Sequence, residues 1–293
     1  MTTHLEHEVE TTLRIATPGD ADRCGQIFYD AFAAIATAHN FPVEPGSPEF
    51  AHYKAGEMLE SPGIHGLVAE RDGIVVGSAF VDERSTISAI GPVTVEPGSQ
   101  NAGVGTALMR SLLQRQRDRD SAGTRLVQTA YHSRSLALYT MLGFTVREPL
   151  SVLQGTLAGV STGALTARPA RTQDNDQCAE LCVAVHGHDR AAERAAAIEA
   201  GTATVVERGG EVAGYATGFG YGWHAVAEDN SSIIALLGSA DSFMGLGILV
   251  PSRNGELLRW CMQHGMRLVQ QANLMSIGLY NEPAGAWLPS IVY

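Results

Sequence analysis

The sequence predicts an α/β protein built from two copies of one structural unit. Three observations support this: the chain repeats itself, each copy contains a β-hairpin pattern, and strand-like and helix-like segments follow in the same order in both copies. The chain has 293 residues, whereas a typical domain has about 100–200. Its 45% hydrophobic and 17% charged residues are typical of a globular protein. Two folded domains are therefore expected.

The repeat is visible in two places. Residues shared at an offset of 154 are Arg14, Ala16, Asp20, Asp22 and Cys24, which recur as Arg168, Ala170, Asp174, Asp176 and Cys178. Residues 68–77 align with residues 205–214, and in each segment apolar residues alternate on both sides of a turn dipeptide, Asp72-Gly73 or Gly209-Gly210. Such a dipeptide between alternating runs is typical of a tight hairpin.

The elements of the first copy follow from periodicity and from turn residues. Alternation predicts strands, and apolar residues at helical spacing predict helices. The expected order is strand 13–16, helices within 20–38 and 49–60, hairpin 66–82, strand 87–95, helix 105–118, strand 125–130, helix 133–142 and strands around 144–157. A small, uncharged, glycine-bearing run follows. The predicted organisation is a polar tail 1–12, an N-terminal domain 13–157, a linker 158–166 and a C-terminal domain 167–293.

Charge and composition exclude several classes of function. There are 20 basic and 31 acidic residues, a net charge of −11, and Lys54 is the only lysine. Nucleic acid is therefore not an expected partner. No apolar run is long enough to span a membrane, and the first residues are polar and acidic, unlike a signal peptide. We expect a cytoplasmic protein without a membrane partner.

Cysteine and histidine spacing does not favour a metal site. The four cysteines lack CxxC spacing and are expected to be buried, reduced thiols. His186 and His188 form the densest histidine pair, but no carboxylate or cysteine lies beside them at ligand spacing. No metal is predicted.

The segment from 93 to 108 has the pattern of an anion-binding turn. A β-rich run ends at Pro97, a polar loop carrying Gly103 and Gly105 follows, and the chain enters an apolar helical pattern. Exposed N–H groups at a helix N-terminus favour a pyrophosphate. The alternative is an ordinary strand-to-helix turn.

Two motifs resemble the GCN5-related N-acetyltransferases (GNAT). Gln-Asn-Ala-Gly-Val-Gly at 100–105 matches the family's Arg/Gln-x-x-Gly-x-Gly/Ala motif, and Leu-Tyr-Thr-Met-Leu-Gly-Phe at 138–144 is similar to the end of a family helix. The resemblance implies tandem GNAT-like domains, each with a mixed, mostly antiparallel central sheet flanked by helices.

The same resemblance implies acetyl-CoA as co-substrate. Backbone groups of the strand near Val93 and Val95 would pair with the pantetheine arm, and main-chain N–H groups from Gln100 to Thr106 would hold the pyrophosphate. His132 stands where the family commonly has asparagine. The implied cofactor-binding residues are Val93, Thr94, Val95, Gln100, Asn101, Ala102, Gly103, Val104, Gly105, Thr106, His132 and Ser135.

The resemblance also implies that Tyr139 is the catalytic acid. A phenol with a pKa of about 10 is neutral at pH 7 and can donate a hydrogen bond or a proton to a developing thiolate, whose thiol has a pKa of about 8–9. The alternative is a packed helix tyrosine. A strand N–H near Val95 would stabilise the oxyanion. The acceptor amine needs a base, but Glu96, Asp82 and Glu83 only flank the strand, so no base is assigned.

The second copy departs from both motifs. Glu-Asp-Asn-Ser-Ser at 228–232 replaces the glycine loop, with Asn230 or Ser231 suited to cap the following helix, and Cys261 stands where the tyrosine is expected. The second copy is therefore interpreted as degenerate and without cofactor. Met-Gly-Leu-Gly at 244–247 precedes a run that reads as a strand. The tail 278–293 is expected to form a closing strand of the second sheet; the alternatives are a substrate wall or a base at the Tyr293 carboxylate.

Together these observations predict an acetyl-CoA-dependent N-acetyltransferase that acts on a primary amine of a small molecule or peptide. The acidic chain suits a cationic acceptor during encounter. The alternatives are a non-catalytic acyl-CoA-binding regulatory protein and a structural protein in which both copies are scaffolds. A monomer or homodimer is expected.

Overall fold

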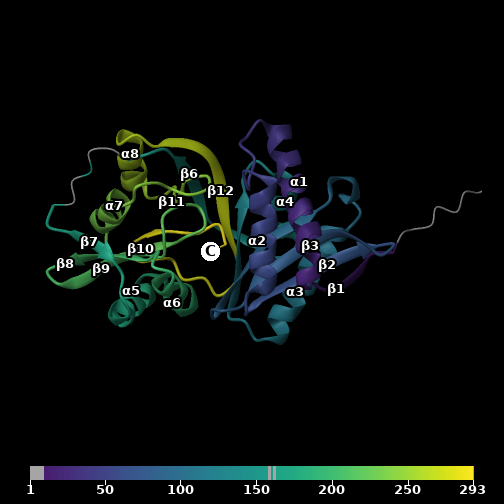
Figure 1. The fold of residues 1–293 in the computed structure, drawn as a ribbon, viewed down its shortest axis with the longest axis horizontal. Coiled ribbons are helices and arrows are strands. Elements are labelled where there is room, and N and C mark those ends of the chain that lie inside the picture. Colours follow the sequence, from purple (N-terminus) through teal and green to yellow (C-terminus); the bar gives the residue numbers. More distant parts are fainter. Residues whose placement is uncertain (1–9, 158–159, 161–162, 293) are drawn as a thin grey trace, which may run out of the picture. The chain divides into compact units, whose positions relative to one another are not determined.

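The computed structural model describes residues 10–157, 160 and 163–292 and divides into two compact units (Figure 1). The first unit contains residues up to Asp82 and Ile90–Arg119, and the second contains Glu83–Ala89 and the residues from Asp120 on. The division cuts through one strand, whose first three residues belong to the second unit. The compact units therefore do not coincide with the copies along the sequence.

The first unit is a sheet covered on both faces. Its strands, in sheet order, are β1 (Thr12–Ile15), β2 (Ile64–Arg71), β3 (Ile74–Asp82) and residues 90–95 of β4 (Ile87–Val95). Its helices are η1 (Pro18–Asp20), α1 (Ala21–His39), α2 (Pro48–Glu60), η2 (Pro97–Ser99) and α3 (Val104–Asp118). Val68 and Phe80 pack with Cys24 and Ile27 of α1. Gly77 faces α3, where an added Cβ would lie 3.1 Å from Cγ1 of Val104; this glycine lets α3 approach the sheet closely.

The second unit contains two groups of strands. One consists of residues 87–89 of β4, then β5 (Gly123–Thr129), β12 (Arg267–Gly278), β6 (Thr145–Gln154) and β11 (Ile248–Pro251), in that order. The other is an antiparallel sheet in the order β13 (Ala286–Leu288), β10 (Ala225–Ala227), β9 (Glu211–Ala216), β8 (Thr204–Arg208) and β7 (Thr166–Pro169). The helices are α4 (Ser133–Met141), η3 (Thr172–Asp174), α5 (Asn175–His186), α6 (Ala191–Glu199), α7 (Asn230–Gly238) and α8 (Gly255–Gln263).

Helices cover both faces of the second sheet. Figure 1 shows α5 and α6 below it and α7 above it. Tyr215 of β9 packs in one core cluster with Cys178 and Cys182 of α5. The neighbouring Gly214 points to the other face, where an added Cβ would lie 3.3 Å from Cδ1 of Leu236 in α7. Gly214 thus repeats the role of Gly77, which confirms the aligned hairpins.

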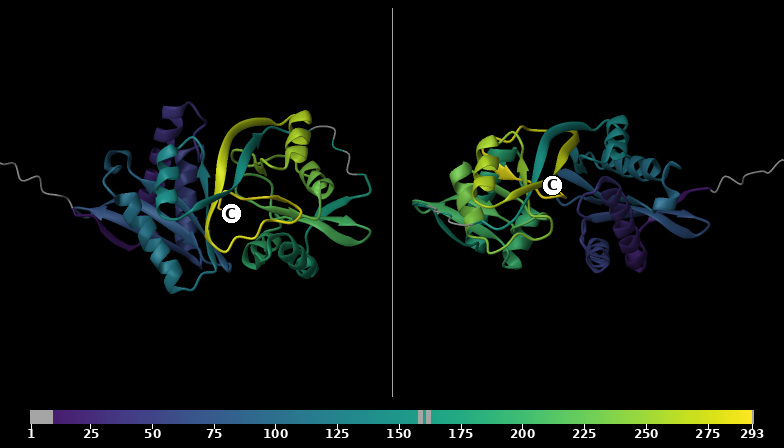
Figure 2. Two further views of the ribbon diagram at one scale, coloured as in Figure 1. Left: turned by 180° about the vertical axis from the view of Figure 1, so that it is seen from behind. Right: turned by 90° about the horizontal axis from the view of Figure 1, so that it is seen from above.

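The two copies exchange strands within the second unit. β12, from the second copy, lies between β5 and β6 of the first copy, and β6 in turn lies between β12 and β11 of the second (Figure 2). All these pairings are antiparallel. The sequence predicted several strands around 144–157, but the chain forms the single strand β6. A strand in this position satisfies hydrogen bonds on both of its edges.

The repeat is most exact in a partly buried ion cluster. Arg14 donates to both carboxylate oxygens of Asp20 at 2.8 Å and pairs with Glu70 at 2.7 Å. Arg168 pairs in the same way with Asp174 at 2.7 and 2.8 Å, and also contacts Glu207. The residues that repeat at a constant offset in the sequence therefore include a contact that is repeated in the structure. In each copy, an arginine links the start of a helix to a hairpin.

The other expectations have the following outcomes. The fold is the predicted tandem, mostly antiparallel one, with β4 and β5 as the parallel pair among the strand pairings above. All four cysteines are buried and reduced, as expected. No helix within the described ranges is long and apolar enough to cross a membrane. The domain boundaries stay a prediction; residues 1–9 of the tail and 158, 159, 161 and 162 of the linker lie outside the described residues.

Candidate active site

The glycine loop joins β4 to α3 in the first unit. It contains the short helix η2, and two of its residues have left-handed backbone conformations: Asn101 has φ of 65° and Gly103 has φ of 81°. Gly103 is the N-cap of α3. An added Cβ at Gly103 would meet no atom within 4 Å, so the glycine is required by its backbone conformation and not by crowding.

The N-terminus of α3 presents backbone N–H groups. Helix geometry leaves the N–H groups of Val104, Gly105 and Thr106 without intrahelical acceptors, and the Gly103 cap has no side chain to accept from them. The 15-residue helix adds a partial positive charge at this end. This arrangement suits an anion such as a pyrophosphate.

Side chains hold the loop at several points. Gln100 Nε2 donates to the backbone oxygen of Val95 at 3.0 Å. Arg71 donates to the backbone oxygen of Ala102 at 3.0 Å, which places a cation beside the loop. Arg23 pairs with Glu96 at 2.7 Å. The sequence analysis missed Arg71 and Arg23, because the arginines that reach a loop depend on the hairpin and helix behind it.

The strand residues proposed to bind the cofactor differ in which of their groups are available to it. The ladder between β4 and β5 covers Ile87 to Ala89, so Val93 and Val95 lie beyond it. The Thr94 side chain is buried, with its hydroxyl 2.9 Å from that of Ser78. Thr94 therefore has only backbone groups to offer, whereas side chains alternate along a strand and those of Val93 and Val95 point to the opposite face.

Tyr139 lies on α4 in the second unit. Its ring packs edge to face against Phe144, with 6.0 Å between ring centroids, and its backbone oxygen accepts from the Phe144 N–H at 3.0 Å. The side chain keeps partial exposure, yet burial around the hydroxyl raises the pKa of Tyr139 to about 12. The phenol is therefore protonated at neutral pH.

Gln128 of β5 organises the first turn of α4. Its side-chain nitrogen donates to the backbone oxygen of His132 and to the Ser135 hydroxyl, both at 3.0 Å. Ser135 itself donates to the His132 oxygen at 2.9 Å. The hydroxyl proton of Ser135 is thus used inside the turn. The sequence analysis missed Gln128, since no local pattern marks a strand glutamine as a helix anchor.

The proposed site residues are divided between the two units. The residues from Val93 to Thr106 belong to the first unit, and His132, Ser135 and Tyr139 belong to the second. Of the flanking acids, Glu96 forms an ion pair with Arg23 at 2.7 Å. The base stays unassigned.

The matching turn of the second copy is filled by acidic side chains. Asp229 is the N-cap of α7 and accepts from the Ser232 N–H at 2.9 Å, so the expected caps Asn230 and Ser231 were wrong. Although burial opposes it, hydrogen bonds from Ser231, Ser232 and Arg208 hold the pKa of the Asp229 carboxyl well below its usual value. Asp229 is the cap, rather than its polar neighbours, because its carboxylate accepts hydrogen bonds from several donors at once.

The remaining second-copy predictions concern Cys261, β11 and the tail. Cys261 is fully buried on α8, and burial raises the pKa of its thiol to about 12. The run after 244–247 is the strand β11, as expected. Residues 286–288 form β13, which pairs with β10 and closes the second sheet, so the preferred interpretation of the tail is confirmed. Tyr293 lies outside the described residues.

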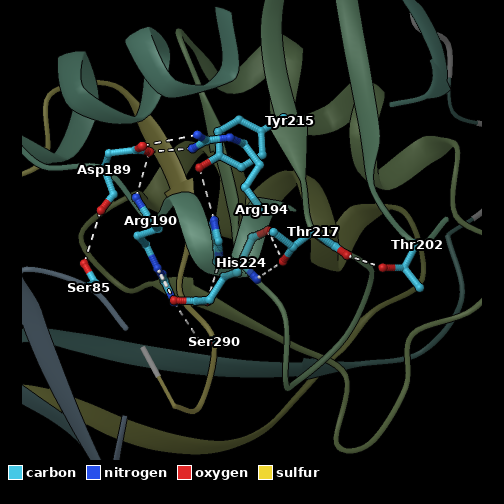
Figure 3. Close-up of polar contacts among 10 residues, drawn as sticks. Ser85, Asp189, Arg190, Arg194, Thr202, Tyr215, Thr217, His224 and Ser290 are labelled. Atoms are coloured by element: carbon cyan, nitrogen blue, oxygen red, sulfur yellow. Dashed lines mark hydrogen bonds and ion pairs between the residues drawn. The ribbon is translucent and has the colours of Figure 1, made fainter. Parts of the chain in front are cut away.

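A buried polar cluster lies between α6 and the second sheet (Figure 3). Glu193 contacts Nδ1 of His224 at 3.3 Å, and Nε2 of His224 lies 3.1 Å from the Tyr215 hydroxyl. Arg190 pairs with Glu193 at 2.6 Å, and Arg194 binds Asp189. Burial and the Arg190 charge lower the pKa of His224 to about 4, so this histidine is neutral at pH 7.

This cluster does not form a metal site. Among the described residues, no group of three or more histidine, cysteine or acidic side chains has the geometry to hold a metal ion. His186 and His188 lie 5.9 Å apart between ring centroids, and His186 packs against Trp287. The charged side chains of the cluster around His224 are paired, as buried charges usually are.

Comparison with known proteins supports the family and the fold. Residues 28–144 match the family model described as acetyltransferase (GNAT) family. No curated protein matches the chain. Among solved structures, a Pyrococcus horikoshii protein proposed to be an acetyltransferase is 20% identical with a TM-score of 0.69, and the match covers 99% of this chain and 97% of that one.

Two further structures match over nearly their whole length. A GCN5-related N-acetyltransferase from Sphaerobacter thermophilus is 14% identical with a TM-score of 0.61, covering 93% of this chain and 96% of that one. A tandem GNAT protein from the clavulanic acid biosynthesis pathway is 14% identical with a TM-score of 0.57, covering 96% and 100%. At these identities the structures establish the tandem fold alone.

Proposed function

The chain belongs, through the domain at residues 28–144, to the acetyltransferase (GNAT) family, and on this premise we propose that it transfers the acetyl group of acetyl-CoA to a primary amine. The observation that carries the proposal is the N-terminus of α3, where a glycine in the left-handed region replaces a capping side chain. Backbone N–H groups there suit the pyrophosphate, and Arg71 beside the loop adds positive charge.

The chemistry requires an acid, and Tyr139 is suited to that role. The amine nitrogen attacks the thioester carbonyl, the carbon–sulfur bond then breaks, and the sulfur takes a proton from the phenol as the amide forms. With a pKa of about 12, Tyr139 is protonated at pH 7. Because a thiol has a pKa of about 8–9, Tyr139 is the weaker acid, so it stabilises the developing thiolate by donating a hydrogen bond, and a proton that it gives up must return to it from solvent. The amine proton leaves to a base that is not assigned.

The binding part of the proposal is tested by calorimetric titration of acetyl-CoA into the intact chain. We expect one site per chain, and its loss in Gly103→Glu, which adds a carboxylate to the loop. No binding to the intact chain would overturn the proposal. Two sites per chain would show that the second copy also binds the cofactor.

The catalytic part is tested with Tyr139→Phe and a panel of primary amines. Loss of the acid should lower kcat by about 100-fold or more with little change in acetyl-CoA affinity. Binding of acetyl-CoA without transfer to any amine, and without hydrolysis, would favour the alternative function of a non-catalytic acyl-CoA-binding regulator.

A further inference from the structure

The first turn of α4 is held by a hydrogen-bond chain that begins in the second copy. Asn273 of β12 lies opposite Gln128 of β5 in the strand register. Its Nδ2 donates to Oε1 of Gln128 at 2.8 Å, and the Gln128 amide nitrogen donates in turn to the backbone oxygen of His132 and to Ser135. We propose that Asn273 is a positioning residue for Tyr139, acting through Gln128; this rests on the proposed function.

The direction of this chain of hydrogen bonds is fixed by its acceptors. The Gln128 nitrogen faces the backbone oxygens of Thr129 and His132, which can only accept. The amide must therefore point its nitrogen toward them and its oxygen toward β12. The group opposite that oxygen has to be a donor, and Asn273 supplies it.

Burial makes the contact costly to lose. Gln128 is 2% exposed, so its amide cannot replace the lost partner with bulk water, and an unsatisfied buried polar group is expensive. Rotation of the amide would bring oxygen against oxygen at His132. Either response shifts the first turn of α4.

A shift at the first turn reaches Tyr139 because α4 is a short, continuous helix. Ser133–Met141 is nine residues long, and Tyr139 lies about two turns beyond His132. Small displacements of a catalytic group lower the rate steeply while leaving substrate binding largely intact. The second copy is thus more than a scaffold, since it supplies a group on which the proposed acid depends.

The test uses the isosteric variant Asn273→Asp, which cannot donate when ionised, in a double-mutant cycle with Tyr139→Phe. We expect Asn273→Asp to lower kcat by about tenfold, with the acceptor KM and the acetyl-CoA affinity within about twofold of the unaltered chain. In the Tyr139→Phe background the same substitution should have almost no effect on kcat, because its partner is gone.

The matched control is Gln271→Glu, the same amide-to-carboxylate change on an exposed residue of the same strand, which should leave kcat unchanged. If Asn273→Asp does not fold, Asn273→Ala removes the donor without adding charge, and the same coupling to Tyr139 is expected. An equal loss of kcat in both backgrounds, or no loss beyond the control, would overturn the inference. Absence of transfer by the unaltered chain would overturn the proposed function as well.

Discussion

The N-termini of α3 and α7 occupy equivalent positions in the two copies, but they are capped differently. α3 begins at Gly103, which has φ of 81° and no side chain, whereas α7 begins at Asp229, whose carboxylate accepts from Ser232. Arg208 closes the second turn by pairing with Glu228 and Asp229 at 2.9 and 2.7 Å. One N-terminus is left open to an outside anion, and the other is satisfied by the chain's own acids.

The difference teaches that the fold alone does not make a cofactor site. Both helices have a partial positive charge and N–H groups without intrahelical acceptors at their N-termini. What decides the function is which group meets them, and this is set by a few residues of the turn. The second turn uses its own carboxylate as a stabilising cap, so we expect it not to bind an outside anion.

The strongest test of this comparison is to place an acidic residue in the turn before α3, as in the turn before α7. Gly103→Asp should lower acetyl-CoA affinity by about 100-fold, because a carboxylate at the N-terminus competes with and repels the pyrophosphate. Gly103→Asn is the matched control: it has the same shape, tolerates the left-handed backbone and carries no charge. Calorimetry of both variants checks this. Equal losses would mean that backbone strain, not charge, is responsible.

Lowering the pH should destabilise the second copy more than the first, because the described part of the second copy buries neutral histidines. Burial lowers the pKa of His188 and of His224 to about 4 from 6.5. The unfolded chain therefore binds protons that the folded one does not, and stability is lost as pH falls from 6.5 toward 4. At pH 5 this amounts to about 2 kcal/mol for His224 alone.

Hydrogen exchange at pH 7 and pH 5 measures this loss element by element. Amides of β9 and β10 should lose more protection than those of β2 and β3, and His224→Gln should reduce the difference. Earlier opening of β2 and β3 would contradict the assignment of the acid sensitivity to the histidines.

Removing the second turn's acid tests its role as a cap. Asp229→Ala should lower the free energy of unfolding by about 1 kcal/mol, the typical cost of a lost N-cap. Urea denaturation measures this, with Asp241→Ala, an exposed acid in a loop, as the control. An unchanged midpoint would mean that water satisfies the α7 N–H groups equally well.

The smallest expected effect is the difference in stability between variants of the two ion clusters. Arg14→Ala and Arg168→Ala should each destabilise by about 1 kcal/mol, and Arg168→Ala by more, because the Arg168 side chain is 21% exposed and that of Arg14 is 40% exposed. Thermal unfolding of the two variants side by side checks the order. The reverse order would show that exposure does not govern these pairs.

Most residues of the candidate site were proposed from the sequence because the signals that mark them are local. The glycines of the loop, the Leu-Tyr and Gly-Phe run and the aligned hairpins all depend on residues close in the chain. The cap of α7 was predicted less well: it is Asp229, one residue before Asn230 and two before Ser231, since neighbouring polar residues compete for the same N–H groups. Arg71 and Gln128 left no local signal.

The sequence by itself determined the repeat, the hairpins with their turn dipeptides, and the contrast between a glycine turn and an acidic turn. Only the tertiary structure decided that β12 enters between β5 and β6, that β13 pairs with β10, and that Asn273 faces Gln128. Turns and helices follow from interactions a few residues apart. The partner of a strand is chosen among all available edges by burial across the whole sheet, which no local pattern encodes.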